Sequence, residues 1–84
     1  MLGGIKTPIG SGNLNDYEEE GVYFVNGFVE NTPNNTNSRA FLIVKRGNVA
    51  SATYIMQEYT ETLNATNRRW IRVKDGAWSN WKEL

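Results

Sequence analysis

From Gly21 onward the chain is a series of short strand-forming runs separated by turn residues. The run Val22 to Val25 is β-branched and aromatic, and the run Ala40 to Val44 is continuously apolar. Such side chains are typical of strands, because they pack well on a pleated surface. We find no convincing long helix and no internal repeat. The sequence therefore predicts an all-β domain.

Turn residues set the boundaries of the expected strands. The segment Asn31 to Ser38 has loop chemistry, since Asn favours turns and Pro33 cannot donate a ladder hydrogen bond. Asp75-Gly76 is a strong hairpin signal. Further turns are expected at Asn26-Gly27, at Gly47-Asn48 and over Thr60 to Asn67. The strands themselves are expected over Val22–Val25, Ala40–Val44, Thr53–Tyr59 and Arg69–Val73.

Short loops between the later strands predict antiparallel neighbours. We expect a small, mainly antiparallel sheet or a compact β-sandwich of four to five short strands. Residues 1–12 are punctuated by Gly and Pro and are expected to be a linker or lead-in, with one β domain over residues 13–84. Leu14 and Tyr17 lie three residues apart, which predicts one helical turn capped by Asn13 or Asn15.

The core of such a domain is thin, because a chain of 84 residues removes only about 60–65% of its unfolded surface from water. There is no cysteine, so disulfides cannot compensate. Large aromatic side chains can compensate for the thin core, because each of them buries a large area. The run Ala40 to Val44 is apolar at every position, which predicts a strand covered on both faces.

Catalysis is hard to build from these residues. The chain has neither His nor Cys, so the commonest acid/base residue and the strongest common nucleophile are both missing. A pair of carboxylates can cleave a glycoside. The candidates sit in no recognisable motif, and they are Glu18, Glu58, Glu61, Asp75 and Glu83. We expect a protein that is not an enzyme and that needs no metal or cofactor.

Charge and hydropathy argue against two classes of partner. The formal net charge is zero, so nothing attracts a polyanion over long range. An aromatic-basic cluster of Arg68, Arg69, Trp70 and Arg72 is the feature that favours single-stranded nucleic acid. No apolar run approaches the roughly 20 residues that span a bilayer, and the start lacks the apolar core of a signal peptide. We expect no nucleic-acid binding and no membrane insertion.

The chemistry that remains is aromatic, amide and guanidinium chemistry. It suits sugar recognition, in which aromatic faces stack on a pyranose and amides bond its hydroxyls. It equally suits the interior of a small β domain. We interpret Trp78 and Trp81 as residues that cover the core, in preference to surfaces on which a ligand stacks. We interpret Gln57 and Arg72 as a structural pair that satisfies backbone carbonyls.

An ordered set of motifs extends over residues 13 to 84. In chain order they are Asn13-Leu14-Asn15-Asp16-Tyr17, Gly21-Val22-Tyr23-Phe24-Val25, Asn31-Thr32-Pro33, Leu42-Ile43-Val44, Gln57-Glu58-Tyr59, Trp70-Ile71-Arg72 and the ending Trp78-Ser79-Asn80-Trp81-Lys82-Glu83-Leu84. The chain thereby resembles the pyocin-knob domain family of bacteriophage and R-type pyocin tail fibres. It departs from that family in its polar loop Asn34 to Ser38, where many members are glycine-rich.

The resemblance implies a knob-like domain of a tail fibre that takes part in attachment to the host cell surface, with a bacterial surface glycan as the target. A structural spacer or trimer-assembly module without a ligand is the alternative. The expected partners are that glycan and other tail-fibre subunits, with a homotrimer as one form. The expected location is the phage virion or a prophage product made in the bacterial cytoplasm.

The same resemblance assigns residues. The positions that match the family motif, and that we interpret as fold-defining, are Gly21, Tyr23, Asn31, Pro33, Gln57, Arg72, Trp78 and Trp81. A ligand is expected on the two Asn-rich loops, and the candidate residues there are Asn34, Asn35, Asn37, Asn64 and Asn67.

Overall fold

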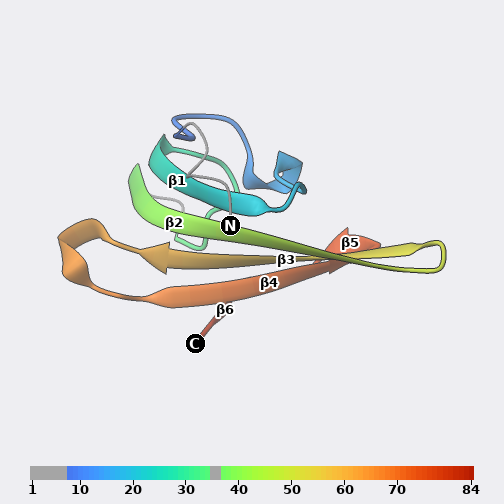
Figure 1. Cartoon of the computed structure of the whole chain (residues 1–84). Helices are drawn as coiled ribbons and strands as arrows, with labels where there is room; N and C mark the ends of the chain where they lie inside the picture. The colour runs from blue at the N-terminus through green and yellow to red at the C-terminus, as the bar shows by residue number, and fades with distance from the viewer. Residues whose placement is uncertain (1–7, 35–36) are drawn as a thin grey trace.

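The computed structural model describes residues 8–34 and 37–84, and it shows one antiparallel sheet (Figure 1). The strand order is β1-β2-β3-β4-β5, and β6 pairs with β4. The strands are β1 (Gly21–Phe28), β2 (Asn37–Val49), β3 (Ala52–Glu61), β4 (Arg69–Asp75), β5 (Ala77–Trp78) and β6 (Lys82–Glu83), with single 3-10 turns η1 (Leu14–Asp16) and η2 (Leu63–Ala65). The predicted all-β class and antiparallel order are confirmed.

The helical turn before the sheet is present and has the expected cap. Asn13 is extended, and its side-chain Oδ1 accepts a hydrogen bond from the backbone N–H of Asn15 at 2.8 Å. This bond satisfies one of the amide groups that a helix start leaves free. Asn13, and not Asn15, is therefore the capping residue.

The β2–β3 hairpin is longer than predicted. The expected turn at Gly47-Asn48 is wrong, because both residues pair in the ladder, opposite Tyr54 and Thr53. The hydroxyl of Thr53 also donates to Oδ1 of Asn48 at 2.9 Å. The chain turns beyond them, where Ala50 has a φ of 54°. Cross-strand bonds have overridden a local turn preference, and the hairpin projects well past β1 (Figure 1).

The expected turn at Asn26-Gly27 is also wrong, since β1 continues to Phe28. Gly27 has a φ of 142°, and a Cβ there would lie 2.6 Å from the carbonyl oxygen of Gly10. Glycine is therefore needed for a close approach of two backbones and not for a reversal. The two Asn-rich loops are correspondingly shorter than predicted, because Asn37 and Ser38 begin β2, and Thr60 and Glu61 end β3.

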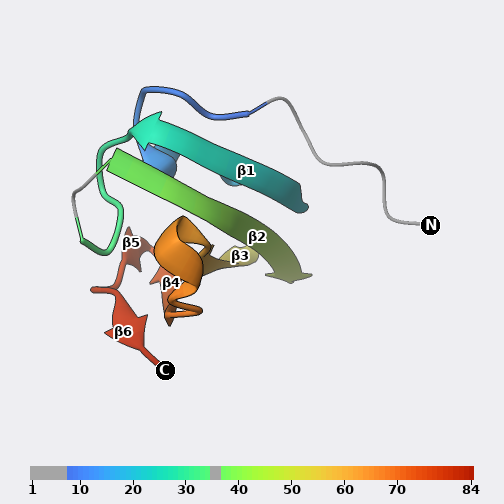
Figure 2. The same ribbon diagram turned by 90° about the vertical axis from the view of Figure 1, so that its left-hand side faces the viewer.

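The hairpin at Asp75-Gly76 is confirmed. Gly76 has a φ of 79°, and Asp75 and Lys74 pair with Ala77 and Trp78. The sheet curls strongly, so that the loop after β1 reaches down to β5 and the segment that follows it (Figure 2). Two parts of the chain that are far apart in sequence are thereby brought together.

One face of the sheet, which we call the covered face, carries the core. Its buried apolar side chains are Tyr23, Val25, Ala40, Leu42, Val44, Ile55, Tyr59 and Trp70. Segments outside the main strands cover them, through Ile9, Leu14 and Val29, with Tyr17, Trp78 and Trp81 packed against the edge. Ile9 is only 3% exposed and pairs with Val25, although it lies in the segment expected to be a lead-in.

The opposite face, which we call the open face, is uncovered and mostly apolar, with Lys45, Glu58, Thr60 and Arg69 also on it. Strand alternation places on it Val22, Phe24, Phe41, Ile43, Tyr54, Met56, Ile71 and Val73. Phe41 is 36% exposed and Val73 is 48% exposed. The prediction that Ala40 to Val44 is covered on both faces is therefore wrong, because no described segment packs over this side.

Candidate binding cleft around Arg72

Gln57 is the polar centre of the covered face. It is fully buried, and its Nε2 donates to the carbonyl oxygens of Leu14 at 2.7 Å and Tyr17 at 2.9 Å. These carbonyls lie in and just after η1, where a helical turn leaves acceptor capacity unused, although the carbonyl of Leu14 also accepts from the N–H of Tyr17 at 3.2 Å. Gln57 therefore fastens the covering segment to β3 and satisfies groups that would be costly to bury alone.

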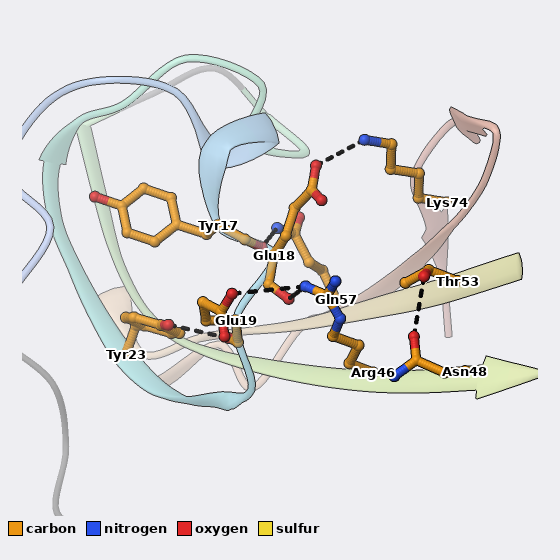
Figure 3. A network of polar contacts seen from close by, with 9 residues as sticks. All are labelled: Tyr17, Glu18, Glu19, Tyr23, Arg46, Asn48, Thr53, Gln57 and Lys74. Atoms are coloured by element: carbon orange, nitrogen blue, oxygen red, sulfur yellow. Dashed lines mark hydrogen bonds and ion pairs between the residues drawn. The ribbon is translucent and has the colours of Figure 1, made fainter. Parts of the chain in front are cut away.

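The residues that follow η1 reinforce this attachment (Figure 3). Glu18 forms an ion pair with Lys74 of β4 at 2.6 Å. Arg46 of β2 lies 3.6 Å from the Glu19 carboxylate, and the hydroxyl of Tyr23 donates to the Glu19 carbonyl at 3.0 Å. The acidic run is thus tied to three strands. These half-exposed pairs add little stability individually, but they hold the segment in place above Gln57.

Arg72 of β4 completes the buried polar pair. Its Nε donates to Oε1 of Gln57 at 2.8 Å, so the expected pairing of the two residues is present. The guanidinium lies between two indoles, with Cζ 4.1 Å from the ring centroid of Trp78 and 4.5 Å from that of Trp81. Arg72 is 5% exposed, and burial lowers the pKa of its guanidinium to about 10.

The two tryptophans are positioned by hydrogen bonds from three segments. Ser79 N–H donates to the carbonyl of Val73 at 2.8 Å, and the Ser79 hydroxyl accepts from the N–H of Val73 at 3.0 Å. Nε1 of Trp81 donates to the carbonyl of Asn31 at 2.9 Å. Asn31 in turn donates to Oδ1 of Asn13 at 2.8 Å. The loop after β1 and the segment after β5 therefore face each other across Arg72.

Between these segments lies a polar cleft of about 300 Å³. Its walls are Asn15, Asn31, Thr32, Arg72, Trp78, Ser79, Asn80 and Trp81. Three polar atoms of these residues are buried without a hydrogen-bond partner, and they are Asn15 Oδ1, Arg72 Nη2 and Trp78 Nε1. Unsatisfied buried groups are uncommon in folded proteins and often mark a site where a ligand or an ion completes the bonding.

The sequence-predicted residues divide between this cleft and other places. Asn31, Arg72, Trp78 and Trp81 meet at the cleft, and Gln57 supports it from below. Tyr23 belongs to the core. Gly21 starts β1 opposite Val44, and Pro33 lies half-buried in the loop before β2.

The two Asn-rich loops adjoin one another, and only Asn31 and Thr32 of the first are among the described residues that line the cleft. Asn34 Nδ2 and the Thr66 hydroxyl both donate to Glu61, each at 2.7 Å. Asn37 is an exposed strand residue, and Asn64 and Asn67 have φ values of 57° and 56°. Asn35 lies outside the described residues.

Sequence reasoning missed four residues of the cleft wall, Asn15, Thr32, Ser79 and Asn80. Each of these residues lies inside one of the family motifs, which we interpret from the sequence alone as fold-defining and not as parts of a binding site.

Other kinds of site find no support among residues 8–34 and 37–84. No group of three or more acidic side chains is placed to hold a metal ion there. Within the same residues, no helix is long and apolar enough to cross a membrane.

Comparison with known proteins supplies the family. A comparison with curated proteins and one with solved structures gave no match. A family model described as "XkdV N-terminal domain" matches residues 3–84, which is nearly the whole chain. The match confirms the relationship to phage tails that the motifs implied. The chain belongs to the XkdV N-terminal domain family, a family of phage and prophage tail proteins, and is a phage-associated structural protein.

Proposed function

We propose that the domain is a non-enzymatic knob of a tail fibre, which takes part in host attachment by binding a surface glycan in the cleft around Arg72. The observation that carries this proposal is the convergence of indole, amide, hydroxyl and guanidinium groups on one polar cleft. The ordered motifs shared with pyocin-knob domains support the same role.

The cleft offers the two kinds of contact that sugars need. The partly exposed indoles of Trp78 and Trp81 present apolar surface for the C–H face of a pyranose. Asn80 and Ser79 are exposed beside them and can exchange hydrogen bonds with ring hydroxyls. A volume of about 300 Å³ is near the lower end of small-molecule sites, which suits one or two sugar rings of a longer chain.

The placement of the carboxylates supports a role without catalysis. Glu18 is paired with Lys74, Glu58 with Arg69 and Glu83 with Arg68. Glu61 accepts bonds from Asn34 and Thr66. None of the cleft-lining residues is acidic. A bound glycoside would therefore find no general acid next to its linkage.

The aromatic-basic alternative is weakened by the same pairings. Arg68 and Arg69 each form an ion pair with a glutamate, and Arg72 is buried beneath Trp78 and Trp81. Arg68 also lies over the Trp70 ring at 4.7 Å. The cluster is thus not an open stacking surface with free cations, which single-stranded nucleic acid requires.

Binding of host envelope polysaccharide by the trimeric fibre or by the isolated domain tests the proposal. We expect the Asn80→Ala variant to bind about five- to tenfold more weakly, because it removes an amide at the cleft mouth. The matched control is Asn37→Ala, which removes an exposed amide from β2. Absence of binding by the fibre, with phage adsorption unchanged after deletion of the domain, would refute the proposal.

The open face favours a second function, that of a spacer or trimer-assembly module. Its apolar side chains continue into a depression of about 440 Å³ at the far end of the hairpin. The lining residues include Tyr54, Met56 and Val73, with Lys45 and Asp75 at the rim. Another tail-fibre subunit could cover this surface. Sedimentation velocity of the isolated domain discriminates, since a monomer at all concentrations would count against assembly through this face.

A further inference from the structure

Arg72 is a buried cation for which the protein supplies no anion. Among the described residues, Arg46, Arg68 and Arg69 each reach a glutamate, whereas no carboxylate forms an ion pair with Arg72. Removing a charged group from water is costly unless it is paired. The neutral Oε1 of Gln57 and the two indole faces compensate only in part.

Arg72, which lines the cleft, has unused hydrogen-bonding capacity. Nε of Arg72 is bonded to Gln57, whereas Nη2 is buried without a partner. A guanidinium offers a planar fork of donors that matches the two oxygens of a carboxylate or a phosphate. The indole N–H of Trp78 is a further unpaired donor in the same cleft wall.

The surroundings strengthen attraction of an anion. Of the described residues that line the cleft, Arg72 alone is charged. The next cation is Lys74, whose Nζ lies 5.9 Å from the Trp78 ring and is paired with Glu18 at 2.6 Å. The two indoles keep water from the guanidinium, and charge interactions are stronger where water is excluded.

We propose that the cleft binds an anionic group of a saccharide, a carboxylate or a phosphate, through the guanidinium of Arg72. This inference rests on the proposed glycan-binding function and specifies the ligand class. The rings of Trp78 and Trp81 both contact the guanidinium, and the bond to Gln57 fixes its orientation. The ligand supplies the negative charge that none of the ion pairs among the described residues brings to Arg72.

The test is an NMR titration of the 84-residue chain that follows the three indole N–H signals. The first probe is trigalacturonic acid, and the second is its methyl ester, which has the same skeleton without charge. A glycerol-phosphate oligomer distinguishes phosphate from carboxylate. We expect the acid or the phosphate to shift Trp78 and Trp81 saturably, at least about tenfold more tightly than the ester, with Trp70 unchanged.

Variants assign the effect to Arg72. Arg72→Gln should abolish the preference for the charged saccharide, whereas the matched variant Arg68→Gln removes an exposed guanidinium and should leave it unchanged. The dispersed Trp70 signal reports whether each variant is folded. If Arg72→Gln does not fold, the comparison of acid with ester in the unaltered chain still decides.

Two outcomes overturn the inference. Equal binding of acid and ester would show that charge is not recognised, and would leave the glycan function intact. If none of the three probes binds, the inference that the cleft takes an anionic saccharide is also overturned. The glycan function itself would then fail only if host polysaccharide also failed to bind.

Discussion

Each face of the sheet carries residues of the polarity that is usually found on the other side. The covered face buries Gln57 and Arg72 along with its apolar core, whereas the open face leaves Phe41 and Val73 partly in water. Both faces belong to the same strands and differ only in what packs against them. In a domain this small, the covering segments decide which side chains are buried, and the strand pattern decides only which side chains share a face.

The difference also concerns specificity. Apolar contacts on the open face tolerate many partners of similar shape. The covered face is held by bonds with defined geometry, from Gln57 to two carbonyls and from Arg72 to Gln57. The bonded amide of Gln57 favours a single arrangement of the covering segment.

The largest effect is expected from removing the polar centre of the covered face. Gln57→Ala leaves the carbonyl of Tyr17 and the Nε of Arg72 without partners, and the carbonyl of Leu14 keeps only its bond from the N–H of Tyr17. Each buried orphan costs about 1–3 kcal/mol, so we expect a loss of about 4 kcal/mol in the free energy of unfolding. Urea denaturation measures it. Asn48→Ala is the control, because it removes an exposed side-chain hydrogen bond. A loss of stability below about 1 kcal/mol for Gln57→Ala would contradict the contrast drawn between the two faces.

Two neighbouring residues of β2 measure the contrast between the faces directly. Leu42 is fully buried on the covered face, and Phe41 is 36% exposed on the open face. We expect Leu42→Ala to lower the free energy of unfolding by about 3 kcal/mol, and Phe41→Ala by about 1 kcal/mol. Equal losses in thermal or chemical denaturation would mean that the open face is covered in solution.

The open face should also differ in its response to protein concentration. If it associates with other subunits, Phe41→Thr should lower the sedimentation coefficient at high concentration, with little change in the midpoint of unfolding at low concentration. Thr is chosen because it retains strand preference. The baseline is Asn37→Thr, a substitution on the same face of β2 that removes no apolar side chain.

The smallest effect is expected at the edge of the sheet, where Arg68 and Glu83 form a bidentate pair with bonds of 2.9 Å and 2.8 Å. The hydrogen bonds from Arg68 lower the pKa of Glu83. A carboxylate with a lowered folded pKa contributes stability above its unfolded pKa and loses it as pH falls through the folded value. Arg68→Gln should return the Glu83 pKa toward its ordinary value, with only a slight change in stability. The carboxyl carbon shift of Glu83 in an NMR titration measures this pKa. If the pair does not persist in solution, the pKa of Glu83 will be the same in Arg68→Gln as in the unaltered chain.

Local sequence patterns were sufficient for the elements whose causes are local. The cap at Asn13, the reversal at Gly76 and the alternation of Trp70 with Ile71 all follow from neighbouring residues. The strand ends could not be predicted in this way. Gly47 and Asn48 have turn chemistry, yet their pairing with β3 outweighs it.

The cleft was also beyond local reasoning. Its wall combines Asn15, Asn31 and Asn80, which become neighbours only because the sheet curls (Figure 2). The sequence did single out Arg72 and the two tryptophans near it. The guanidinium of Arg72 lacks an anion because no carboxylate of the described residues forms an ion pair with it in the folded chain. The spacing of residues along the sequence does not reveal this.

The strand order has a consequence for the order of folding. Each long ladder joins neighbours in sequence, so β1 to β4 can form as a series of hairpins, which close in microseconds. The bond from Gln57 to Leu14 spans 43 residues, and the bond from Trp81 to Asn31 spans 50. Contacts of such separation form late, because more chain entropy must be lost first. During synthesis the open face is therefore available before the cleft exists, and the cleft is complete only after Trp81 has emerged from the ribosome.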